Sequence, residues 1–93
     1  MTNLLNEQLA WLAANSKHTF TVYKHNKNGK VLTNCEFVNQ HNAIQENVSI
    51  LQNAPVGSTL EETEIDKNYY GEDVGDVLVN VWQRKADQTW ERI

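Results

Sequence analysis

The dipeptide Asn28-Gly29 is the feature that most constrains the fold of this chain. It lies between two runs in which polar and apolar residues alternate, 18–25 and 30–38. An Asn-Gly pair favours a type I′ turn, whose two central residues need positive φ, and such turns join antiparallel strands. The sequence therefore predicts a β-hairpin over about residues 18–38.

The position of the turn also sets the expected register of the two strands. With Asn28-Gly29 at the turn, Val22 pairs with Cys35. Phe20 then pairs with Phe37, so that all four side chains lie on one face of the hairpin. Cys35 is expected to be a buried thiol, which behaves as a small apolar group and has little thiolate character.

Two amphipathic helices are expected on either side of this hairpin, over about residues 3–15 and 40–54. The apolar stripe predicted for the first consists of Leu4, Leu5, Leu9, Trp11 and Leu12. In the second, Ile44, Val48 and Leu51 recur at helical spacing. Pro55 follows and is expected to end that helix.

Three more strands are expected, over about residues 58–65, 76–85 and 88–93, with a loop over 67–75. The first is acidic, and charged residues protect exposed strands from aggregation, so it is expected at an edge of the sheet. In the next strand, one face is expected to carry Val77, Val79 and Val81, and the other Leu78, Asn80 and Trp82. Trp82 and Trp90 are expected to form a cross-strand pair.

These elements together predict a single α+β domain over residues 1–93. A chain of 93 residues has room for one core only. Strands joined by short turns indicate an antiparallel sheet of about five strands, with two helices covering one face. The expected order is α-β-β-α-β-β-β.

Charge is distributed unevenly along the chain. The formal net charge of −4 divides into +2 for residues 1–45 and −6 for residues 46–93. The residues expected to bind a partner lie in the acidic stretch 61–76 and are Glu61, Glu62, Glu64, Asp66, Tyr69, Tyr70, Glu72, Asp73 and Asp76. Such a surface fits a protein or ribonucleoprotein complex with a basic surface and repels nucleic acid. A solvated edge made soluble by its charge is an equally good interpretation.

Catalytic, metal and cofactor sites are not expected. Cys35 is the only cysteine, so one chain cannot form a disulfide or a thiolate zinc site. His18, His25 and His41 lack the spacing that places two imidazoles on one helical face, and they are expected to be exposed. No stretch resembles a membrane span or a signal peptide, which favours a cytoplasmic location.

The segment from Phe20 to Ile93 combines the hairpin, a helix ending in Ala54-Pro55-Val56-Gly57-Ser58 and the strand sequence Val79-Asn80-Val81-Trp82. In size, charge and organisation it resembles the small acidic proteins of bacteriophages and mobile elements, and among them the anti-CRISPR inhibitors. This resemblance implies a non-enzymatic inhibitor that blocks a defence complex in the cytoplasm of a bacterial host. The alternative hypothesis is a homodimeric structural or accessory protein that pairs through a sheet edge.

Overall fold

The computed structural model describes residues 3–25, 31–37, 44–67, 71 and 73–93, and it confirms an α+β fold with an antiparallel sheet and two helices. The elements are α1 (Asn6–Asn15), β1 (Thr19–His25), β2 (Val31–Phe37), α2 (Ile44–Gln52), β3 (Thr59–Lys67), β4 (Asp73–Arg84) and β5 (Trp90–Arg92). The strands form one sheet in the order β2-β1-β3-β4-β5, and all neighbouring pairs are antiparallel.

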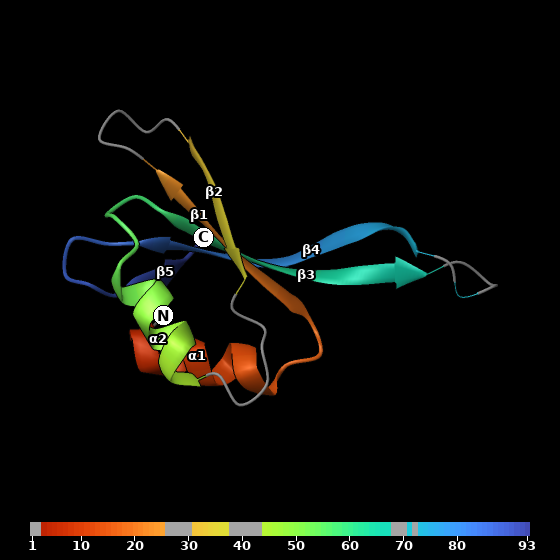
Figure 1. The fold of residues 1–93 in the computed structure, drawn as a ribbon, viewed down its shortest axis with the longest axis horizontal. Coiled ribbons are helices and arrows are strands. Elements are labelled where there is room, and N and C mark those ends of the chain that lie inside the picture. The colour runs from red at the N-terminus through yellow and green to blue at the C-terminus, as the bar shows by residue number, and fades with distance from the viewer. Residues whose placement is uncertain (1–2, 26–30, 38–43, 68–70, 72) are drawn as a thin grey trace.

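Both helices lie on the same side of the sheet (Figure 1), and the core fills the space between them and the strands. Within the core, the rings of Phe20 on β1 and Trp82 on β4 stack with centroids 6.2 Å apart. The predicted spacing of α2 is confirmed by Leu51, which is fully buried, and by Ile44 and Val48, which pack against the core. The buried apolar residues are Leu9, Ala10, Ala13, Phe20, Val22, Leu51, Ala54, Leu60, Trp82 and Trp90.

The apolar stripe predicted for α1 is only partly correct. Leu9 is buried, but Leu5 and Trp11 are 51% and 59% exposed. The helix instead buries Ala10 and Ala13. Small side chains let the helix backbone approach its neighbours closely, and a bulky indole on that face would hold it away. Side-chain size therefore decides the orientation of α1 more than hydrophobicity does.

The prediction that residues 58–65 form an edge strand is wrong, because β3 is the central strand of the sheet. It pairs with β1 from Thr59 to Thr63 and with β4 along its whole length. The acidic composition was misleading because side chains alternate between the two faces of a strand. Leu60 faces the core, while Glu61 lies on the opposite face.

The predicted register of the first hairpin is also wrong, by one residue. Val22 pairs with Glu36, and Tyr23 pairs with Cys35. The ladder is irregular between Tyr23 and His25, and an irregularity of this kind shifts the pairing of every residue beyond it. The expected turn and the surroundings of the Cys35 side chain lie outside the described residues.

The cross-strand pair of tryptophans does not form. Trp82 pairs with Arg92, and Arg84 pairs with Trp90. The connection between β4 and β5 closes with Lys85 N–H donating to the Thr89 carbonyl at 2.9 Å, which places Trp90 opposite Arg84. Leu4 then exchanges two backbone hydrogen bonds with Trp90, at 2.9 and 2.8 Å, and so covers the outer edge of β5.

Asn47 on α2 leads to a first prediction. It is 1% exposed, and its Nδ2 is the only buried side-chain nitrogen or oxygen among the described residues that lacks a hydrogen-bond partner. A buried unpaired polar group costs about 1–3 kcal/mol. We expect Asn47→Leu to raise the free energy of unfolding by about 1 kcal/mol in urea denaturation, whereas Gln45→Leu, at an exposed position of α2, should change it little. A loss of stability in Asn47→Leu would contradict this.

Candidate functional site

The outer parts of β3 and β4 extend beyond the rest of the sheet as a two-stranded arm, formed by residues 64–67 and 73–80 (Figure 1). Pairing between β1 and β3 stops at Thr63, and pairing between β4 and β5 covers only residues 82–84. Among the described residues, residues 64–67 pair only with β4, and residues 73–80 pair only with β3. No described strand therefore covers the outer edges of the arm, and a further strand could pair with their backbone groups.

Three consecutive apolar side chains are exposed on β4 where the arm leaves the sheet. Val77, Leu78 and Val79 are 50%, 55% and 40% exposed. The register shifts here, because Asn80 pairs with Glu62 and Leu78 already pairs with Thr63, which leaves Val79 as an additional residue. This β-bulge makes the predicted alternation of faces along β4 wrong, and it explains how three neighbours are all exposed.

The predicted partner-binding residues do not all lie in one place. Glu64 is exposed on the arm, and Glu61 is half-buried next to it, on β3. Glu62 faces the core and is only 8% exposed. By their backbone positions Asp66, Asp73 and Asp76 belong to the arm, so the predicted loop over 67–75 is shorter than expected. Tyr69, Tyr70 and Glu72 lie outside the described residues.

Glu62 belongs to a buried polar cluster. His18 Nδ1 lies 2.6 Å from Glu62 Oε2, and Asn80 Nδ2 donates to Glu62 Oε1 at 3.0 Å. His18 is consequently half-buried, although the sequence suggested an exposed histidine. Both carboxylate oxygens are used inside the fold, so Glu62 is not part of the acidic surface.

The residues that the structure describes contain no group of three or more His, Cys, Asp or Glu side chains that could hold a metal ion. None of their helices is long and apolar enough to cross a membrane.

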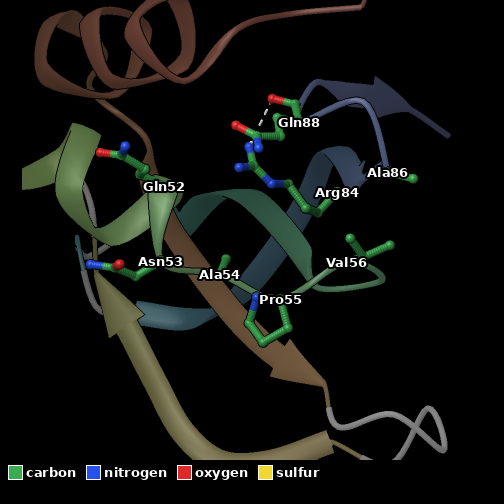
Figure 2. A pocket seen from close by; sticks show the side chains of 8 residues that line it. All are labelled: Gln52, Asn53, Ala54, Pro55, Val56, Arg84, Ala86 and Gln88. Carbon is green, nitrogen blue, oxygen red and sulfur yellow. Dashed lines mark hydrogen bonds between the residues drawn. The ribbon is translucent and has the colours of Figure 1, made fainter.

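A pocket of about 500 Å³ opens between the end of α2 and the connection from β4 to β5 (Figure 2). Its lining residues are Gln52, Asn53, Ala54, Pro55, Val56, Arg84, Ala86 and Gln88. Arg84 is the charged residue among them, and it is 4% exposed. Burial lowers the pKa of Arg84 from its ordinary value, while the negative charge of Asp87 acts in the opposite direction.

Sequence reasoning missed both the exposed apolar group and the buried arginine. Val77, Leu78 and Val79 were interpreted as an ordinary alternating strand, because nothing in the composition marks the bulge. Arg84 lies near the end of the predicted strand 76–85, where nothing marks it as buried. Arg84 follows Trp82 by two residues, and side chains two residues apart on a strand lie on the same face of the sheet. This spacing was the one signal in the sequence for the burial of Arg84.

Comparison of this chain with protein families, with curated proteins and with solved structures finds no match.

Proposed function

We propose that this protein is a non-catalytic binding protein that docks on another protein through the arm of β3 and β4. The observation that carries the proposal is the exposed apolar group Val77, Leu78 and Val79 beside an open strand edge. Exposed apolar side chains that lie together mark interaction sites more often than isolated ones do. An open edge offers backbone hydrogen bonds to a strand added by a partner.

The charge of the arm indicates the chemistry of that partner. Residues 61–76 contain seven acidic side chains and one lysine. Even without the buried Glu62, the segment is strongly negative. A partner with lysines or arginines next to an extended segment would therefore approach faster and bind with better complementarity than a neutral or acidic one.

The same charge disfavours the alternative of a homodimer formed by pairing two copies along β4. Antiparallel pairing of two arms would bring two acidic segments together, and like charges across an interface cost free energy. The open edge and its apolar side chains nevertheless keep self-association as a distinct second candidate. Sedimentation at several protein concentrations separates the two, because the binding-protein proposal expects a monomer.

The apolar contribution is tested with a matched pair of substitutions. Val77 on the arm is 50% exposed, and Val56 on the body of the protein is 61% exposed. A partner captured from bacterial lysate and identified by mass spectrometry should bind Val77→Lys at least about tenfold more weakly than the unmodified protein. Val56→Lys adds the same charge away from the arm and should bind normally. Equal binding by the two variants would contradict docking through the arm.

The charge contribution is tested with a second pair. Glu64→Gln removes an exposed acid from the arm, and Glu7→Gln removes an exposed acid from α1. With the same captured partner, only Glu64→Gln should lower the association rate, and its effect should disappear in high salt as the charges are screened. An identical change in both variants would show that net charge alone controls binding.

A narrower form of the proposal is an inhibitor of a bacterial defence complex of the CRISPR type, carried by a phage and acting in the host cytoplasm. This form depends on the resemblance in size, charge and organisation. Identification of the captured partner as a subunit of such a complex would support it, and a partner unrelated to defence would contradict it.

A further inference from the structure

The guanidinium of Arg84 is buried without an ion pair among the described residues. Its Nη1 donates to Asn6 Oδ1 at 2.6 Å and to the Gln88 carbonyl at 2.9 Å. One face of the guanidinium lies over the ring of Trp90, with Cζ 5.5 Å from the centroid. These contacts fix the orientation of Arg84, but among the described residues its partners are neutral acceptors and an indole, with no counter-ion in contact.

Asp87 is the nearby carboxylate, and it has other partners. Its Oδ1 accepts from the Thr89 hydroxyl at 2.6 Å and from the Thr89 backbone N–H at 3.1 Å. The hydrogen bond from the Thr89 hydroxyl lowers the pKa of the Asp87 carboxyl most, and the one from the Thr89 backbone N–H lowers it further. Asp87 therefore acts on Arg84 only through space, and no hydrogen bond joins the two side chains.

The remaining donors of Arg84 belong to a side chain that lines the pocket. Both hydrogens of Nη1 are used, whereas Nε and Nη2 have no acceptor among the described residues. Both nitrogens are accessible to solvent. Among the described residues, Asn47 Nδ2 is the only side-chain nitrogen or oxygen that is fully buried without a hydrogen-bond partner. Figure 2 shows the guanidinium reaching into the space between Gln52 and Gln88.

We propose that this pocket binds a small monocarboxylate, with Arg84 Nε and Nη2 donating to its two oxygens. Two parallel N–H donors on one edge of a guanidinium match the geometry of a carboxylate. A single negative charge balances the single buried positive charge, whereas a phosphate dianion would bring a second charge to a lining whose other polar side chains are amides. The apolar side chains Ala54, Pro55 and Val56 provide contact for a short hydrocarbon group.

The size of the pocket is compatible with such a ligand. Small-molecule sites commonly enclose about 300–1,000 Å³ and combine apolar walls with a few fixed polar groups. This pocket, at about 500 Å³, lies within that range. It is also separate from the arm, since none of its lining residues belongs to residues 64–67 or 73–80. The two proposals can therefore fail independently.

The direct test follows the Nε–H signals of the two arginines in the folded protein by NMR. The chain contains only Arg84 and Arg92, and Arg92 is exposed, so that one signal reports on the pocket and the other is an internal control. Titration with sodium butyrate should move the Arg84 signal saturably, with a Kd on the order of 1–10 mM. Titration with sodium chloride at equal ionic strength should leave the Arg84 signal in place.

A matched pair of variants then locates the binding. In Arg92→Gln, butyrate should still move the indole Nε1–H signal of Trp90, which is bonded to Asn6 Oδ1 next to Arg84. In Arg84→Gln, this response should be lost. If Arg84→Gln does not fold, the titration of the unmodified protein still decides the question.

Three outcomes would overturn the proposal. An Arg84 signal that does not respond to butyrate would show that the arginine has only a structural role. Equal movement of the Arg84 and Arg92 signals would indicate unspecific ion pairing at the surface. Tighter binding of inorganic phosphate than of butyrate would contradict the assignment of a carboxylate.

Discussion

Replacing Trp90 with alanine should remove about 3–5 kcal/mol from the free energy of unfolding, the usual cost of truncating a large buried aromatic side chain. Trp90 is fully buried and carries one of the largest side chains of the core. Its Nε1–H donates to Asn6 Oδ1 at 2.9 Å, which ties β5 to the start of α1. The substitution therefore leaves a large cavity and also removes this hydrogen bond between β5 and α1.

The loss should be large relative to the total stability. Small domains have only about 5–15 kcal/mol of stability, and a chain of this size lies toward the lower part of that range. Urea denaturation followed by circular dichroism should consequently show a much lower midpoint, or a protein that is partly unfolded without denaturant.

Trp11 provides the matched control. It is the same residue type, but it is 59% exposed on α1. Trp11→Ala should change stability by less than about 0.5 kcal/mol, the usual range for surface positions. Similar losses in Trp11→Ala and Trp90→Ala would show that the indole of Trp90 is not the centre of the core.

The comparison of these two tryptophans also shows how far sequence could predict the fold. The α+β class, the two helices and the antiparallel sheet follow from periodicity, because an apolar repeat of 3.6 or 2 residues is visible in a short window. Periodicity could not decide between Trp11 and Ala10 as the buried residue of α1. That choice depends on how closely the helix must approach its neighbours, which is a property of the assembled layers.

The errors in the predicted sheet also arise from contacts between residues that are far apart in the sequence. The central position of β3 results from pairing with β1, and the sequence separation between Thr19 and Thr63 hides this pairing from local patterns. The extra residue Val79 is also set by the partner strand, because a bulge is defined only relative to the strand opposite. The exposed group on the arm could therefore not be predicted, although the acidic stretch that surrounds it could.

The polar cluster around Glu62 gives the second large prediction. His18→Ala removes the group that lies 2.6 Å from Glu62 Oε2, while Glu62 itself remains 8% exposed. Breaking a buried pair by removing one partner commonly costs about 3–5 kcal/mol, because the remaining charge is uncompensated. His18 is partly exposed, so we expect a loss of about 2–3 kcal/mol by urea denaturation.

A second substitution tests this cause. Glu62 lies on the core face of β3, where Leu60 on the same strand is already part of the core. Replacing both partners of a buried polar contact by apolar residues is often neutral or stabilising. The double variant His18→Ala/Glu62→Leu should therefore recover most of the stability that His18→Ala loses, because the buried carboxylate is removed together with its partner.

Asn80 distinguishes this explanation from a simple loss of packing. It donates to Glu62 Oε1 at 3.0 Å, and in the double variant it loses that acceptor. Because Asn80 is only half-buried, water can replace the acceptor at a cost of about 1 kcal/mol or less. Strictly additive losses in His18→Ala, Glu62→Leu and the double variant would mean that the imidazole stabilises the fold by its volume. Recovery would mean that its role is to compensate the carboxylate at the centre of the sheet.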